Sequence, residues 1–127
     1  MKRDMDLIRT MLLAIEMDDR YDAASLHALE GPSDFGVHDK SFEEVAYHLQ
    51  MIVDRGLIYG KRSNIAPIYG GLTMAGHDFL DSVRDPEIWR QTKDAAGKAG
   101  GFTLDLLVDL AKGLVKTQLK RLTGIEL

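Results

Sequence analysis

The sequence contains no cysteine, and this absence excludes several kinds of chemistry at once. Without thiols the chain can form no disulfide, no thiolate metal site and no cysteine nucleophile. Because stable disulfides belong to oxidising compartments, we expect a cytoplasmic protein.

Long apolar runs are also missing, so no segment is predicted to cross a bilayer and no membrane partner is expected. Lys2 and Arg3 give the N-terminus two positive charges, but Asp4 follows at once. Arg9 and Thr10 then interrupt the apolar stretch that follows, so no signal peptide is predicted.

Basic residues are fewer than acidic residues in this sequence. The 127 residues include 16 basic and 20 acidic residues, which gives a net charge of −4. Proteins dedicated to nucleic-acid binding usually carry a basic face, so this balance argues against strong non-specific DNA binding. It permits a local basic patch. Hydrophobic residues make up 45% of the chain, enough for one domain with a modest core.

The most informative stretch is 41–72. Ser41 followed by Glu44 forms a capping box, which predicts a helix over residues 42–55. Gly56 is expected to end that helix in the left-handed conformation. Strands are then predicted at 57–59 and 68–72, joined by residues 60–67. The helix carries an unbroken apolar stripe formed by Phe42, Val45, Ala46, Leu49, Ile52 and Val53.

Before this stretch, the spacing of apolar residues predicts a helix over 4–17 with Asp4 as its N-cap. Residues 23–30 fit either a short strand, with Ala24, Leu26 and Ala28 on one face, or a short alanine-rich helix. We favour the strand, which would complete a sheet with 57–59 and 68–72. The Gly-Pro and Phe-Gly breakers in 31–40 predict a loop.

After this stretch, three more helices are predicted. Thr73 caps the first, which runs to about Val83, and Asp85-Pro86 starts the second, which runs to about Ala96. Glycines at 97, 100 and 101 separate it from a last helix over 104–122. We expect residues 1–97 to form one domain and 98–127 a C-terminal amphipathic helix.

This order of elements, and two passages in particular, resembles the winged-helix fold. The first passage, at residues 45–58, is VAYHLQMIVDRGLI, similar to the end of winged-helix recognition helices. The second, at 71–83, is GLTMAGHDFLDSV, similar to the segment after the wing. The resemblance implies an α+β winged helix in which 42–55 is the recognition helix and 57–72 the wing. The usual second helix has no counterpart, because a loop is predicted at 31–40.

The whole chain resembles a narrower group, the phage- and prophage-associated domain of unknown function 2513. The resemblance lies in the opening MKRDMDLIR, in GHDFLDSVRDPEIW at 76–89 and in the AGG at 99–101 before the last helix. It implies a winged helix in a phage setting. It carries no catalytic residue and no cofactor.

A DNA contact is predicted at the tip of the wing, where a short polar run could meet a phosphate backbone: Lys61, Arg62, Ser63 and Asn64. Two basic residues neutralise few phosphates, so an ordinary solvated turn is an equally open interpretation.

A protein contact is predicted on the recognition helix. From Ser41 to Gly56 three acids, Glu43, Glu44 and Asp54, face one base, Arg55, which gives a net charge of −2. This surface suits phosphates poorly. The predicted contact residues are Glu44, Tyr47, His48, Met51 and Asp54. Alternatively, other parts of the chain cover this face as core.

The last helix has an apolar face wider than one core contact requires, which predicts a homodimer through Leu106, Leu107, Leu110 and Leu114. In a monomer the first helix would have to cover this face. Lys112, Lys116 and Lys120 form a basic ridge, which is usually just the solvated face of an amphipathic helix.

Enzyme chemistry has little support. The four histidines, His27, His38, His48 and His77, show no metal-ligand spacing, and the glycine pairs match no phosphate loop. We therefore expect no catalytic residue, no metal and no cofactor. The leading hypothesis is a non-enzymatic, phage-type DNA-binding or transcription regulator. The alternative is a protein-binding winged helix that inhibits or modulates a host protein, such as an anti-defence factor.

Overall fold

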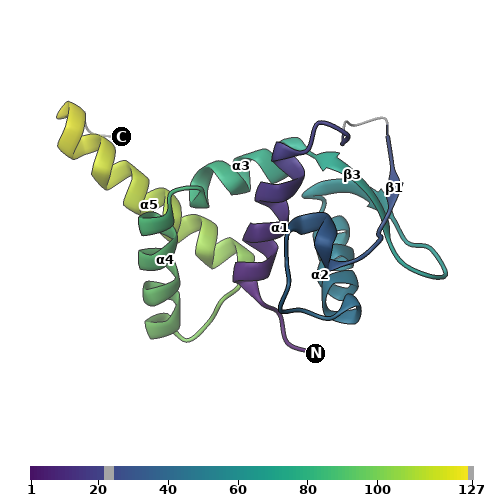
Figure 1. Cartoon of the computed structure of the whole chain (residues 1–127). Coiled ribbons are helices and arrows are strands. Elements are labelled where there is room, and N and C mark those ends of the chain that lie inside the picture. Colours follow the sequence, from purple (N-terminus) through teal and green to yellow (C-terminus); the bar gives the residue numbers. More distant parts are fainter. Residues whose placement is uncertain (22–24, 126–127) are drawn as a thin grey trace. The chain divides into compact units, whose positions relative to one another are not determined.

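The computed structural model describes residues 1–21 and 25–125 (Figure 1). In these residues five α-helices accompany a three-stranded antiparallel sheet, so the predicted α+β class is confirmed. The elements, in chain order, are α1 (Met5–Met17), β1 (His27–Ala28), the 3₁₀ helix η1 (Pro32–Phe35), α2 (Phe42–Asp54), β2 (Ile58–Lys61), β3 (Ile68–Leu72), α3 (Met74–Val83), α4 (Pro86–Ala99) and α5 (Leu104–Thr123).

Contacts group the chain into two compact units, Met1–Asp78 and Phe79–Leu127. The boundary expected from the sequence, between residues 97 and 98, lies inside the second unit. None of the helices in the described residues is both long and apolar enough to cross a membrane.

The sheet of the first unit has the order β1-β3-β2. Lys61 of β2 lies opposite Ile68 of β3, and a bulge interrupts the pairing between Ile58 and Gly60. The connection between β2 and β3 projects beyond the paired strands (Figure 1). β3 matches its predicted bounds, whereas β2 begins one residue later than expected and continues to Lys61.

The strand predicted within 23–30 is present but much shorter than expected. Only His27 and Ala28 pair with β3, and the first residues of the predicted segment lie outside the described ones. Leu26 and Ala28 are exposed, whereas Leu29 is buried. A two-residue edge strand leaves the backbone free to turn, so the expected alternation does not extend along the segment.

Local signals set the ends of both long helices in this unit. Asp4 caps α1 by accepting from the Leu7 N–H at 3.1 Å, and Ser41 and Glu44 form the predicted capping box of α2. Gly56 follows α2 with a φ of 79°, the left-handed conformation predicted for it. The faces that these helices bury form the core: Met5, Leu7, Ile8, Met11, Leu12 and Ile15 from α1, and Val45, Leu49 and Ile52 from α2.

The segment 31–40, expected to be a loop, contains the single 3₁₀ turn η1. Pro32 occupies its first turn, and Gly36 ends it with a φ of 69°. The turn is stable because it buries Phe35 and Val37.

The second unit consists of the end of α3 followed by α4 and α5, which pack against each other. Asp85 caps α4 by accepting from two backbone N–H groups, and Thr103 caps α5, as predicted. α4 continues to Ala99, three residues past the expected end at Ala96. The buried residues of these two helices are Ile88, Trp89, Thr92, Ala96, Leu107 and Ala111.

Candidate functional site

A groove of about 430 Å³ lies in the first unit between α2 and the β2–β3 connection. We refer to it as the α2 groove. One wall comes from α2 and consists of Ala46, Tyr47, Gln50, Met51 and Asp54. The other wall comes from the connection and consists of Arg62, Ser63, Ile65, Ala66 and Pro67. The α2 groove therefore brings together part of each predicted contact: Arg62 and Ser63 of the DNA contact, and Tyr47, Met51 and Asp54 of the protein contact.

An ion pair links the two walls of the α2 groove. The Arg62 guanidinium donates to the Asp54 carboxylate with an Nη2–Oδ2 distance of 2.8 Å. The other oxygen of Asp54 accepts from the Gln50 amide, also at 2.8 Å. Arg62 therefore faces a carboxylate of its own chain, which lowers the net positive charge that this surface could offer to a phosphate.

Apolar side chains lie open beside this pair. Tyr47 is 41% exposed and Ile65 is 93% exposed. Met51 is half-buried. Ile65 lies in the β2–β3 connection, between the ends of the two strands. Open aromatic and aliphatic groups beside a few polar ones are typical of protein-binding surfaces.

The β2–β3 connection has an ordered tip. The Ser63 hydroxyl donates to the Ala66 carbonyl and accepts from the backbone N–H groups of Ile65 and Ala66, at 3.3 Å each. Ser63 thus stabilises the turn, a role that the DNA hypothesis did not foresee. Lys61 and Asn64 are exposed, and neither has an ion pair or side-chain hydrogen bond within the described residues.

Two predicted protein-contact residues have structural roles. His48 was placed beside the exposed face of α2, but it is 1% exposed, so this placement was wrong. Its Nε2 accepts from the Asp4 backbone N–H at 2.8 Å, and its Nδ1 lies 2.7 Å from the Glu44 carbonyl, to which it donates in that tautomer. Glu44 completes the capping box. Tyr47, Met51 and Asp54 remain at the α2 groove.

A second groove, of about 400 Å³, lies where the start of α1 meets residues 36–40. Lys40 and Asp4 form an ion pair across it at 3.3 Å, and the hydrogen bond to Asp4 raises the pKa of Lys40. Asp4 also caps α1, so its carboxylate is already engaged. Within the described residues, no three histidine, aspartate or glutamate side chains gather as metal ligands would.

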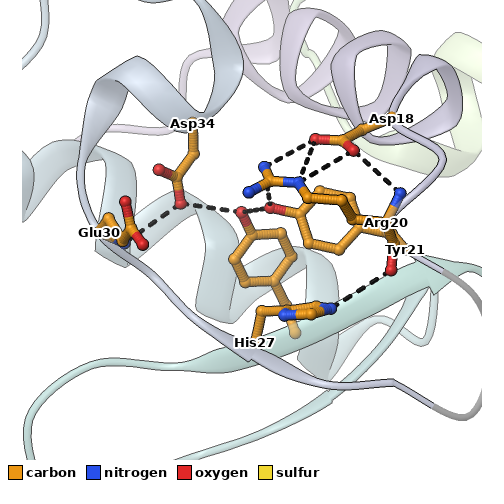
Figure 2. A network of polar contacts seen from close by, with 7 residues as sticks. Asp18, Arg20, Tyr21, His27, Glu30 and Asp34 are labelled. Carbon is orange, nitrogen blue, oxygen red and sulfur yellow. Dashed lines mark hydrogen bonds and ion pairs between the residues drawn. The ribbon is translucent and has the colours of Figure 1, made fainter.

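A polar network joins three distant segments of the first unit (Figure 2). Tyr69 of β3 donates its hydroxyl hydrogen to Asp34 at 2.9 Å and shares a 2.6 Å hydrogen bond with the Tyr21 hydroxyl. Tyr21 in turn accepts from Arg20 at 3.2 Å, and Arg20 is paired with Asp18. Each hydroxyl has one hydrogen, and that of Tyr69 is donated to Asp34, so Tyr21 must donate to Tyr69. Every hydrogen bond in this chain therefore points from the Arg20 guanidinium toward the Asp34 carboxylate.

The tyrosine hydroxyls of this network are suited to holding the three segments together rather than to reacting. Burial, reinforced by the hydrogen bond with Tyr21, raises the pKa of Tyr69 far above its usual range. Burial also raises the pKa of Tyr21. The hydroxyls therefore stay protonated near neutral pH and serve poorly as bases or nucleophiles. The Arg20 hydrogen bonds lower the pKa of Asp18, which keeps the outer end of the network charged.

The predicted dimer residues differ in their exposure. Leu107 is fully buried within the single chain, which contradicts its assignment to a dimer face. Leu106, Leu110 and Leu114 are half-buried. The basic ridge of Lys112, Lys116 and Lys120 is exposed along α5.

Several residues of these sites were not predicted from the sequence. Ile65 and Gln50 line the α2 groove, and Tyr21, Asp34 and Tyr69 form the network. Tyr69 and Tyr21 are 48 positions apart, so no local spacing could connect them. An isoleucine within a polar turn is the one local anomaly that could have pointed to the α2 groove.

Comparisons with known proteins place the chain in a family without indicating an activity. An uncharacterized protein of Haemophilus influenzae is 31% identical over 121 residues, which make up 92% of this chain and 94% of the relative. No solved structure matches the chain. Residues 2–102 match the family model described as Hypothetical protein (DUF2513), and the chain therefore belongs to that family.

Proposed function

We propose that this protein is a non-enzymatic winged-helix module that binds another protein through the α2 groove. In the phage-type setting that its motifs resemble, the partner would be a protein of the host cell whose activity it inhibits or modulates. The chemistry of the α2 groove supports this function better than DNA binding.

The winged-helix assignment is supported by the order of elements in the first unit. A helix, an edge strand, a short helical turn, a second long helix and a two-stranded hairpin follow one another as α1, β1, η1, α2 and β2–β3. In this assignment η1 takes the place of the usual second helix, α2 is the recognition helix and the β2–β3 connection is the wing.

One observation carries the proposal: Arg62, the base nearest the groove, is paired with Asp54 of the recognition helix at 2.8 Å. The pair gives this part of the surface no net charge, and open apolar groups stand beside it. DNA-reading helices instead present basic and amide side chains to the major groove. Apolar anchors surrounded by polar groups favour a protein partner.

A capture experiment tests the proposal. Wild-type protein and the variant Tyr47→Ala with Met51→Ala are used as bait in host-cell extract. Tyr59→Ala is the control, since Tyr59 is 42% exposed but does not line the α2 groove. A partner retained by the wild type and by Tyr59→Ala should be lost with the groove variant, and the purified partner should show at least about a tenfold weaker Kd for it. Equal retention by all three proteins would refute the role of the groove.

DNA binding through the wing is the second candidate function. It is supported by Lys61, at the end of β2, and Asn64, in the β2–β3 connection, both of which are exposed. Lys61→Ala with Asn64→Ala should abolish salt-sensitive binding to duplex DNA if the wing contacts phosphates. Unchanged duplex binding by that variant would exclude the wing as the contact.

A further inference from the structure

The charges on the outer face of α5 are separated by sign along the helix. Asp105 and Asp109 stand in its first two turns, and Lys112, Lys116 and Lys120 continue the same stripe. All five side chains are exposed. From residue 110 to residue 125 the sequence has four basic residues and no acidic one. One half of the helix is therefore acidic and the other half is basic.

A narrow strip with heptad spacing runs beside this charged stripe. Leu106, Leu110, Gly113 and Thr117 follow one another at intervals of four, three and four residues. Leu106 and Leu110 are half-buried, whereas Gly113 and Thr117 are exposed. A Cβ built at Gly113 would meet nothing within 4 Å, so the middle of the strip is open to the approach of another backbone.

We propose that the protein forms a homodimer in which two α5 helices pair antiparallel along this strip, crossing near Gly113. A two-fold axis there makes the contact self-complementary. Antiparallel pairing brings Asp109 of each copy next to Lys116 of the other. Parallel pairing would set acidic halves against each other and basic halves against each other, so charge complementarity selects the antiparallel arrangement.

The pairing is tested by exchanging the two charges. Sedimentation velocity of the full chain across a concentration series should show the 14.2 kDa species shifting reversibly to twice that mass. Asp109→Lys should raise the Kd of the dimer about tenfold, because two repulsive Lys–Lys pairs replace the two attractive Asp109–Lys116 pairs. Lys116→Glu should raise the Kd by a similar factor, because it creates two repulsive Asp–Glu pairs. Asp94→Lys, an equal change of charge on α4, is the control and should leave the dimer unchanged.

Two further samples separate antiparallel pairing from a general effect of charge. The double variant Asp109→Lys with Lys116→Glu restores both opposite pairs and should dimerise like the wild type. An equal mixture of the two single variants should form a heterodimer more tightly than either variant pairs with itself. Far-ultraviolet circular dichroism checks that the helices remain folded. If either charge-reversing variant disturbs the folding of α5, the neutral variants Asp109→Asn and Lys116→Gln replace them. Each neutral variant removes one charge and should weaken the dimer less than the corresponding reversal.

The outcomes that overturn the proposal are distinct. A single 14.2 kDa species for the wild type at every concentration would exclude the dimer. Equal dimerisation by the wild type and both single variants, or failure of the double variant to recover, would exclude the antiparallel arrangement. None of these results depends on whether the α2 groove binds a protein.

Discussion

Arg62 and Asp54 are eight positions apart in sequence, and their side chains meet at 2.8 Å to connect the β2–β3 connection to α2. Arg62 was predicted to contact DNA and Asp54 to contact a protein, so the ion pair connects the two surfaces that the sequence analysis had kept separate. As a result, the site is better described as one groove than as a basic tip beside an acidic helix.

The ion pair should contribute little to stability. The side chains of Arg62 and Asp54 are 71% and 49% exposed, so water screens their attraction. Asp54→Asn should lower the free energy of unfolding by less than about 1 kcal/mol. Urea denaturation followed by circular dichroism measures this. A loss several times larger would mean that the pair holds the fold together rather than shaping the groove.

The Tyr69 hydroxyl should contribute more to the free energy of unfolding than the Arg62–Asp54 ion pair does. Tyr69→Phe removes the donor to Asp34 and the partner of Tyr21 in a buried setting, so the free energy of unfolding should fall by about 1–3 kcal/mol. Tyr59→Phe is the matched control, because the 42% exposed Tyr59 forms no hydrogen bond through its hydroxyl within the described residues. That variant should stay within about 0.5 kcal/mol of the wild type. Equal losses for both variants would contradict the account of the network.

The same network predicts a loss of stability in alkali. Burial raises the pKa of Tyr69 and of Tyr21 above the ordinary tyrosine value, so the unfolded chain releases these protons first. The folded state then holds more protons than the unfolded state, and the free energy of unfolding should fall as pH rises above about 10. Urea midpoints from about pH 8 to about pH 11 test this, with Tyr69→Phe as the comparison. The decline should be shallower in that variant, and equal slopes would exclude Tyr69 as its source.

Gly76 should tolerate no side chain. A Cβ at this position would collide with the backbone carbonyl of Leu57. Gly76 lies in the first turn of α3, and Leu57 directly precedes β2. Gly76→Ala should therefore cost about 3 kcal/mol or more, because backbone atoms cannot move aside cheaply. Gly97→Ala is the control, since its Cβ would meet only the Phe102 ring at an ordinary 3.6 Å. That change should be neutral or stabilising, by up to about 1 kcal/mol. Similar thermal midpoints for the two variants would contradict the close approach at Gly76.

Sequence reasoning located the elements whose signals are local. The capping box at Ser41, the glycine stop at Gly56 and the Asp85-Pro86 start each depend on a few adjacent residues, and each was predicted correctly. The second glycine of the GLTMAGHDFL passage, Gly76, is explained by its close approach to Leu57. The capping box, the glycine stop and the Asp85-Pro86 start required no knowledge of tertiary contacts, whereas the role of Gly76 did.

The errors arose where distant segments meet. His48 was expected near the surface, yet the start of α1, 44 positions away, covers it and donates to its ring. Leu107 was assigned to a dimer face, whereas the single chain buries it. Phe42 belongs to the apolar stripe of α2, yet it is 37% exposed in the first turn of that helix. Helical periodicity gives the direction of a side chain, and only the packing of other elements decides whether it is covered.

Fluorescence anisotropy of labelled duplex DNA at low salt, with wild-type protein and Asp54→Asn, tests the central claim most directly. The α2 groove account predicts no salt-sensitive binding by the wild type. It also predicts that binding appears, if at all, only when Asp54→Asn frees the Arg62 guanidinium. Salt-sensitive binding by the wild type that is lost in Lys61→Ala with Asn64→Ala would contradict the claim and make the protein a DNA-binding winged helix.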